Sequence, residues 1–250
     1  MQKRFILAII LLGIILAIVT VKAFMLIPVN DNAKENSHAP ENSPVINNNW
    51  ELERIDFIHY AKPLAVGGAK QTTCYKLMGV KWTNTPVDYI INPSNPQGLS
   101  EEFVTSAITT SAETWDKATS TELFSNIASI DYTVQYGIQD FKNAIVFGYY
   151  PDNNAIAVTS VWFTRIGRKI VEFDQIYNVY YTWSDANSSV GVMDLQNIAT
   201  HELGHAVGLG DIYSLSCSAV TMFGYSDYGE TSKRTLEEAD IEGLRKIYRA

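Results

Sequence analysis

Hydrophobic residues occur in two different patterns along the 250-residue chain, and the first is a single run near the N-terminus. Residues 5–21 contain no charge, Lys22 interrupts the run, and apolar residues continue to Val29 after a short basic start. A cleaved signal peptide has an apolar core of about 7–15 residues, whereas a membrane-spanning helix needs about 20. Residues 1–29 therefore predict either a signal anchor or a cleaved signal peptide. The basic start keeps the N-terminus inside, so either alternative places the rest of the chain outside.

The pattern changes sharply after this run. Residues 30–49 are polar, with two prolines and several asparagines, and they predict a linker that cannot bury a core. Residues 50–71 form an N-terminal extension whose structure the pattern leaves open. Residues 72–250 alternate between β-rich and helical patterns and predict one folded domain.

Three helices are predicted within this domain. Ser100 caps the first, which carries two glutamates in its first turn. The second covers residues 194–209, and the third begins at Thr235, where Thr235 and Glu238 have the spacing of a capping box. Strands are predicted at 74–82, 87–93, 130–136, 143–150, 155–164 and 169–183. This order predicts an α+β domain with mixed α/β layers.

Composition narrows the function classes. The chain is 46% hydrophobic and 18% charged, which is typical of a globular protein, and its formal net charge is −8. An acidic chain without a basic patch is a poor binder of nucleic acid, so no nucleic-acid partner is expected. Cys74 and Cys217 are the only cysteines, and neither belongs to a CxxC pair. They are interpreted as a disulfide if the compartment is oxidising; two free thiols, or one thiol near a metal, are the alternatives.

Two of the four histidines lie four residues apart in the second predicted helix. His201 and His205 therefore share one helical face and can bind one metal ion together. Glu202 lies about 100° further around the helix, where it cannot join the same ligand set but can reach a water on that ion. This HExxH pattern indicates a zinc hydrolase in which Glu202 is the general base.

The residues that follow extend the pattern. Gly208 can adopt the positive φ that ends a helix and reverses the chain, which lets Asp211 return toward the metal. A carboxylate oxygen is an acceptable zinc ligand, so His201, His205 and Asp211 are the predicted ligands of one catalytic Zn²⁺ ion.

The chain resembles the metzincin zinc metalloproteases, and within them the matrixins (peptidase M10-type). The resemblance rests on "NIATHELGHAVGLGD", "VTMFGY" and "TLEEADIEGLRKIY", and more loosely on "YKLMGVKWTNTPVDYIIN". Asp211 stands where most metzincins have a third histidine, as in the snapalysin-like proteases.

This resemblance implies a twisted, mixed five-stranded sheet with an active-site helix and a C-terminal helix, and it makes residues 72–250 a metzincin-like catalytic domain. It also implies that Met222 forms the Met-turn beneath the metal and that Asp240 supports this turn. Only His38 and His59 lie outside the HExxH motif, so the second, structural zinc site of matrixins is not expected.

The sequence therefore predicts a zinc endopeptidase acting on extracellular proteins or peptides, either anchored to the membrane by its N-terminal segment or secreted. The substrate is expected to bind as an extended strand along the edge strand 155–163, and Phe223 and Tyr225 are candidates for the pocket wall beyond the scissile bond. Two alternatives stay open: a catalytically silent, membrane-tethered metzincin-like binding module, and a hydrolase of a non-peptide amide. The cleavage specificity and the oligomeric state do not follow from the sequence.

Overall fold

The computed structural model describes residues 51–61 and 73–248. Within these ranges, seven strands form one mixed sheet in the order β3-β2-β4-β6-β5-β1-β9, and two short strands, β7 and β8, form a second. The strands are β1 (Leu52–Ala61), β2 (Ile90–Asn92), β3 (Ser129–Ile130), β4 (Ala144–Gly148), β5 (Ala155–Thr164), β6 (Ile170–Asn178), β7 (Trp183–Ser184), β8 (Met193–Asp194) and β9 (Tyr225–Ser226). The helices are α1 (Glu101–Asp116), α2 (Leu195–Ala206) and α3 (Glu238–Ile247), with 3-10 turns η1 (Leu215–Cys217) and η2 (Ser232–Arg234).

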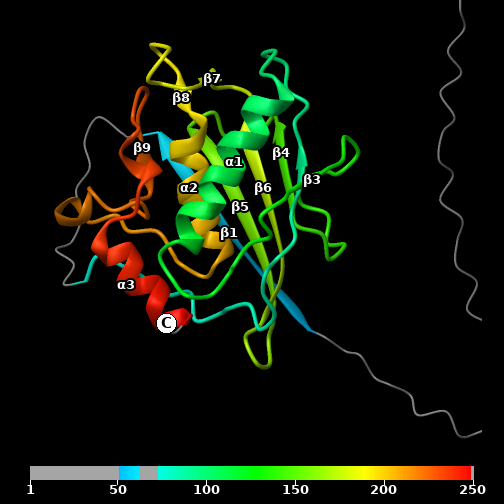
Figure 1. The fold of residues 1–250 in the computed structure, drawn as a ribbon, viewed down its shortest axis with the longest axis vertical. Helices are drawn as coiled ribbons and strands as arrows, with labels where there is room; N and C mark the ends of the chain where they lie inside the picture. The colour runs from blue at the N-terminus through cyan, green and yellow to red at the C-terminus, as the bar shows by residue number, and fades with distance from the viewer. Residues whose placement is uncertain (1–50, 62–72, 249–250) are drawn as a thin grey trace, which may run out of the picture. The chain divides into compact units, whose positions relative to one another are not determined.

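The helices α1 and α2 lie side by side on one face of the large sheet (Figure 1). The main hydrophobic core fills the space between them and the strands, and it includes Trp115, Ile156, Phe173, Leu203 and Met222. A smaller buried cluster covers the opposite face, formed by Val134, Ala144, Val146, Ala155, Val158 and Ile176. The predicted α+β class, with a mixed sheet and a C-terminal helix, is confirmed.

The sheet has more strands than the five that were expected. The order β3-β2-β4-β6-β5 accounts for five, and β1 and β9 extend the sheet beyond β5. The strand β1 pairs antiparallel with β5 from Leu52–Thr164 to Tyr60–Ala155, and it pairs parallel with β9. The prediction that residues 155–163 form an open edge is therefore wrong, because β1 occupies that edge.

Several predicted boundaries also differ from the structure. Residues 74–82 make isolated bridges to two different partners and form no strand. The run 130–136 contributes only its first residue to β3. Helix α3 begins at Glu238 rather than Thr235, because the capping box is formed by Glu237 and Asp240. A capping box fixes the helix start through paired side-chain and backbone hydrogen bonds, and these bonds form two residues later than predicted.

Cys74 and Cys217 form a disulfide, which is the pairing predicted for an oxidising compartment. The bond joins the segment before β2 to the turn η1, and it excludes Cys217 as a thiol ligand of a metal.

Among the described residues, none of the helices combines the length and apolar character that crossing a bilayer requires. The predicted signal segment (1–29) and linker (30–49) lie outside the described ranges.

Candidate metal centre

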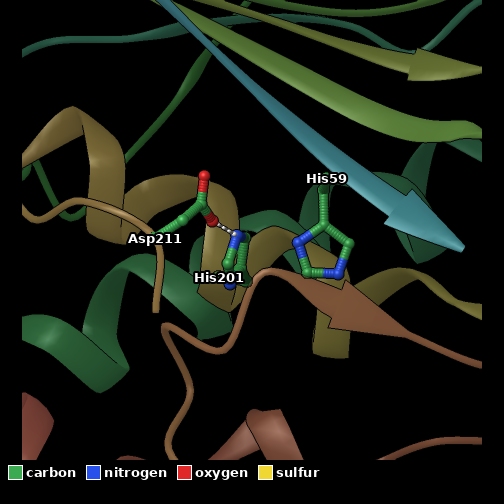
Figure 2. Close-up of side chains that lie close together, drawn as sticks. All are labelled: His59, His201 and Asp211. Carbon is green, nitrogen blue, oxygen red and sulfur yellow. Dashed lines mark ion pairs between the residues drawn. The ribbon is translucent and has the colours of Figure 1, made fainter. Parts of the chain in front are cut away.

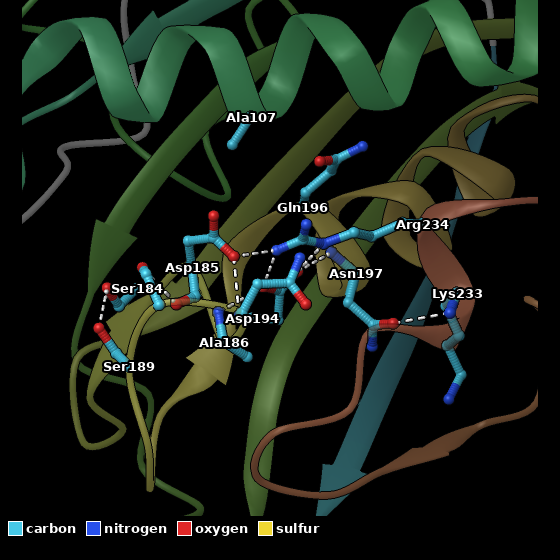
Figure 3. A network of polar contacts seen from close by, with 12 residues as sticks. Ala107, Ser184, Asp185, Ala186, Ser189, Asp194, Gln196, Asn197, Lys233 and Arg234 are labelled. Carbon is cyan, nitrogen blue, oxygen red and sulfur yellow. Dashed lines mark hydrogen bonds and ion pairs between the residues drawn. The ribbon is translucent and has the colours of Figure 1, made fainter.

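The HExxH residues lie on α2, which begins at a well-defined cap. Asp194 Oδ1 accepts a hydrogen bond from the backbone N–H of Asn197 (2.8 Å), the usual arrangement at a helix N-cap. Arg234 binds the same carboxylate and also Asp185, while Asn197 Oδ1 accepts from the backbone N–H of Lys233 (2.7 Å; Figure 3). These contacts tie η2 to the first turn of α2 and fix where the helix starts.

His201 and His205 point their ring Nε2 atoms at each other from consecutive turns of α2, 3.1 Å apart. Each ring donates through Nδ1 to a backbone carbonyl: His201 to Thr221 (2.7 Å) and His205 to Leu209 (2.8 Å). When the rings are neutral, both Nε2 atoms are consequently left as acceptors, which is the form in which an imidazole binds a metal.

Asp211 reaches the two imidazoles after a tight reversal of the chain. Gly208 has φ +100°, and a Cβ at this position would lie 2.5 Å from the carbonyl oxygen of Val80, so only glycine fits here. Beyond this turn, Asp211 Oδ1 lies 3.3 Å from His201 Nε2 and 3.4 Å from His205 Nε2. Tyr213 donates to the other carboxylate oxygen, Oδ2 (3.1 Å), and leaves Oδ1 facing the histidines.

These three ligand atoms fit a zinc ion. Zn–N and Zn–O distances of about 2.0–2.2 Å place neighbouring corners of a tetrahedron about 3.3–3.5 Å apart, and the three observed separations are 3.1, 3.3 and 3.4 Å. Asp211 Oδ1 is buried and has no hydrogen-bond partner, which is costly unless another group compensates it. A divalent cation would compensate it.

Glu202 lies beside this cluster and is fully buried. Thr159 of β5 donates to Oε2, whereas Oε1 is buried without a partner. Burial raises the pKa of Glu202 to about 7. Burial also favours neutral Asp211, but His205 and His201 oppose it and hold the pKa of Asp211 well below its usual range. One carboxyl group is thus suited to holding a cation and the other to exchanging a proton near neutral pH.

Met222 packs directly beneath α2. A Cβ on Gly204 would lie 2.2 Å from Met222 Sδ and 2.7 Å from Trp115 Cζ2, so the glycine inside the HELGH sequence allows this close approach. Asp240 of α3 accepts hydrogen bonds from the backbone N–H groups of Thr221 (2.8 Å) and Met222 (3.1 Å). Because the Thr221 carbonyl holds the ring of His201, Asp240 acts on the position of that imidazole through the Met222 turn.

Two side chains of β1 cover the imidazoles. The Phe57 ring is stacked on His205, with centroids 4.1 Å apart, and the His59 ring contacts His201 edge-on at 3.9 Å. Figure 2 shows His59 reaching from β1 toward His201 and Asp211, and the potential ligand atoms of these three residues lie within 4.8 Å of one another. As a result, the rings of His201 and His205 are fully buried.

Three contributors to this site were not assigned from the sequence: His59, Thr159 and Tyr213. His59 and Thr159 come from β1 and β5. They reach the HExxH motif only because these two strands pair with each other and because α2 packs against the sheet. Tyr213 could have been suggested from the sequence, because it lies only two residues after the predicted ligand Asp211.

The chain is similar in sequence to the matrixins and to several matrix metalloproteinases. The Matrixin family profile matches residues 81–249. Matrix metalloproteinase-16 of Homo sapiens is 26% identical over 182 residues, which cover 70% of this chain and 28% of that protein. Matrix metalloproteinase-25 of Mus musculus is 25% identical (74% and 29% covered), and neutrophil collagenase of Homo sapiens is 27% identical (67% and 33%). The chain thus spans about a third or less of the length of these relatives.

Proposed function

The chain belongs to the matrixin family, and we propose that it is a zinc endopeptidase that hydrolyses peptide bonds in proteins or peptides outside the cytoplasm. The observation that carries the proposal is the convergence of His201 Nε2, His205 Nε2 and Asp211 Oδ1 beside the unpartnered Glu202 Oε1. The disulfide supports an oxidising compartment. Attachment to a membrane through residues 1–29 stays a prediction.

His201, His205 and Asp211 would hold one zinc ion, and Gly208, Met222 and Asp240 would position these ligands. Bound zinc lowers the pKa of water and polarises the carbonyl of the bond to be cleaved. Glu202 then removes a proton from the attacking water as the new C–O bond forms. When the C–N bond breaks, the same carboxyl group delivers that proton to the leaving amine. Thr159 keeps Oε2 occupied, so the free Oε1 is the atom that we assign to the proton transfer.

The test compares full-length, zinc-loaded protein with and without Glu202→Gln, using casein and a fluorogenic peptide library. Because Phe57 and His59 cover the imidazoles, each protein is also prepared with Phe57→Ala/His59→Ala. We expect cleavage in the uncovered background, and Glu202→Gln should reduce kcat by about 10²–10⁴-fold at equal zinc content, the range typical of general-base catalysis.

Two results would contradict this proposal. Cleavage that survives Glu202→Gln would remove Glu202 from the proton transfer. Stoichiometric zinc without cleavage of any peptide in either background would favour the binding module, or a hydrolase of a different amide.

A further inference from the structure

The strand β1 lies between the two walls that are expected to hold a substrate. One wall is β5, with which β1 pairs antiparallel, and the other is the segment after Met222, where β1 pairs parallel with β9. The backbone N–H of Tyr60 donates to the carbonyl of Gly224 (3.4 Å) on the β9 side. The next N–H, that of Ala61, donates to Asn154 (2.9 Å), just before β5. An extended peptide that binds by strand addition would use the same backbone groups.

The side chains of β1 alternate between the two faces of the sheet. Phe57 and His59 face α2 and contact His205 and His201, whereas Ile58 and Tyr60 pack against the small cluster on the opposite face. This alternation places one aromatic ring over each imidazole of the HExxH pair. The strand register has an irregularity between His59 and Tyr60, directly beside the candidate metal centre.

His59 is a polar side chain that makes no hydrogen bond with any of the described residues. Its ring is fully buried, and within this part of the chain neither Nδ1 nor Nε2 has a hydrogen-bond partner. A core histidine normally satisfies at least one ring nitrogen, because burying an unpaired polar group costs about 1–3 kcal/mol. A metal held by His201 and Asp211 would satisfy one of these nitrogens, because the potential ligand atoms of His59, His201 and Asp211 lie within 4.8 Å of one another.

We propose that β1 is an internal occupant of the substrate groove and that His59 is the fourth protein ligand of the zinc ion. This inference rests on the proposed function. Catalytic zinc sites combine three protein ligands with an open position for water, whereas sites with four protein ligands are closed. A His59-ligated centre is therefore latent: its water position is taken by an imidazole and its substrate edge by β1. Peptide cleavage requires β1 to leave the groove.

The first test measures the metal directly, in full-length protein loaded with zinc or with cobalt(II). His59→Phe keeps a ring of similar size but removes both nitrogens, and Ile58→Val trims the opposite face of the same strand as a matched control. We expect His59→Phe to change the visible absorption of the cobalt protein. We also expect this variant to release zinc to a chelator at least about tenfold faster than the wild type, since losing even a residue that supports a metal ligand weakens metal binding by about 10–100-fold. Ile58→Val should match the wild type in both. Identical cobalt spectra and release rates for His59→Phe and the wild type would overturn the assignment of His59.

The second test measures access to the groove. Phe57→Ala/His59→Ala should cleave a short fluorogenic peptide at least about tenfold faster than the wild type. This factor corresponds to a loss of about 1.4 kcal/mol in the free energy with which β1 occupies the groove. Its circular dichroism spectrum and zinc content are compared with those of the wild type to verify folding. An equal or lower rate in a folded, zinc-loaded double variant would refute the internal occupant.

The two proposals fail in different ways. If Glu202→Gln abolishes cleavage while His59→Phe leaves the cobalt spectrum unchanged, the protease stands and His59 is only a packing residue. If His59→Phe changes the spectrum but no protein cleaves any peptide, the ligand assignment stands and the endopeptidase proposal fails.

Discussion

At the scale of single residues, Asp211 combines features that one imidazole could not supply. Its carboxylate presents Oδ1 to the two histidines while Oδ2 accepts from Tyr213. A Cβ on Gly224 would lie 3.0 Å from Oδ1 and 2.4 Å from the Tyr213 ring, so this part of the site is closely packed. The Asp211 carboxylate and the Tyr213 ring are therefore packed together, and we expect that replacing either residue alters the position of the other.

Asp211→Asn tests whether the negative charge of this proposed ligand contributes to zinc binding. The amide keeps the shape of the side chain but is a weaker donor to zinc, and it cannot neutralise the cation. We expect the zinc affinity to fall at least about 100-fold, the upper end of what losing an outer-shell partner costs. Competition with a fluorescent chelator measures this affinity.

Asp227→Asn is the matched control for this measurement, because its side chain is exposed and its zinc affinity should equal that of the wild type. If Asp211→Asn binds zinc as tightly as the wild type, Asp211 is not the third ligand.

At the scale of elements, the site depends on α3 as well as on α2. The Asp240 carboxylate accepts from three backbone N–H groups, those of Thr221, Met222 and Glu237. Through Thr221 it is connected to the ring of His201. Helix α3 thus supports the candidate metal centre through Thr221 rather than through a direct contact of Asp240 with the proposed ligands.

Asp240→Ala would leave the buried N–H groups of Thr221 and Met222, and the partly buried N–H of Glu237, without their acceptor. Each unsatisfied buried group costs about 1–3 kcal/mol, so the two buried groups alone should lower the free energy of unfolding by about 2 kcal/mol or more. Urea denaturation of the metal-free protein measures this change, and the zinc affinity should fall as well because the Thr221 carbonyl is released. Glu238→Ala, an exposed neighbour on the same helix, should change neither quantity. A normal zinc affinity in a folded Asp240→Ala protein would show that the Met222 turn does not depend on Asp240.

Elements with strong local signals could be predicted from the sequence. Ser100 caps α1, where it accepts from the Phe103 N–H (3.1 Å), and the HExxH helix lies where its spacing placed it. The segment 74–82 could not be assigned in this way, because its alternating pattern resembles a strand but its partners are single residues of other segments. The strand β1 was also missed, since its place depends on pairing with residues about 100 positions away.

At the scale of the whole molecule, the same distinction separates the candidate site residues of the HExxH region from the covering strand. His201, Glu202, His205 and Asp211 lie within eleven consecutive residues, so helical geometry and one glycine turn bring them together. His59 lies more than 140 positions earlier in the chain, and no local sequence pattern indicates that it contacts this site. The structure therefore adds His59 to the residues predicted from the sequence. Among the described residues, neither of its buried ring nitrogens has a hydrogen-bond partner, and its strand β1 pairs with β5, the strand along which the substrate was expected to bind.

The disulfide also acts at this scale. Cys217 lies in η1 between Asp211 and Met222, and Cys74 lies in the segment that follows β1 along the chain. The bond therefore restrains the loop that follows Asp211 against the start of the domain. A cross-link between distant residues lowers the entropy of the unfolded chain, so it stabilises the domain whether or not β1 is in the groove.

The central claim is that one zinc ion is bound by His201, His205 and Asp211, with His59 closing the site. The most direct measurement is anomalous diffraction at the zinc edge from a crystal of the zinc-loaded, full-length protein. We expect one strong peak at about 2.0–2.2 Å from Nε2 of both helix histidines, a carboxylate oxygen of Asp211 and a ring nitrogen of His59. A crystal of zinc-loaded protein without a peak between these side chains, or with a peak whose ligands exclude Asp211, would contradict it.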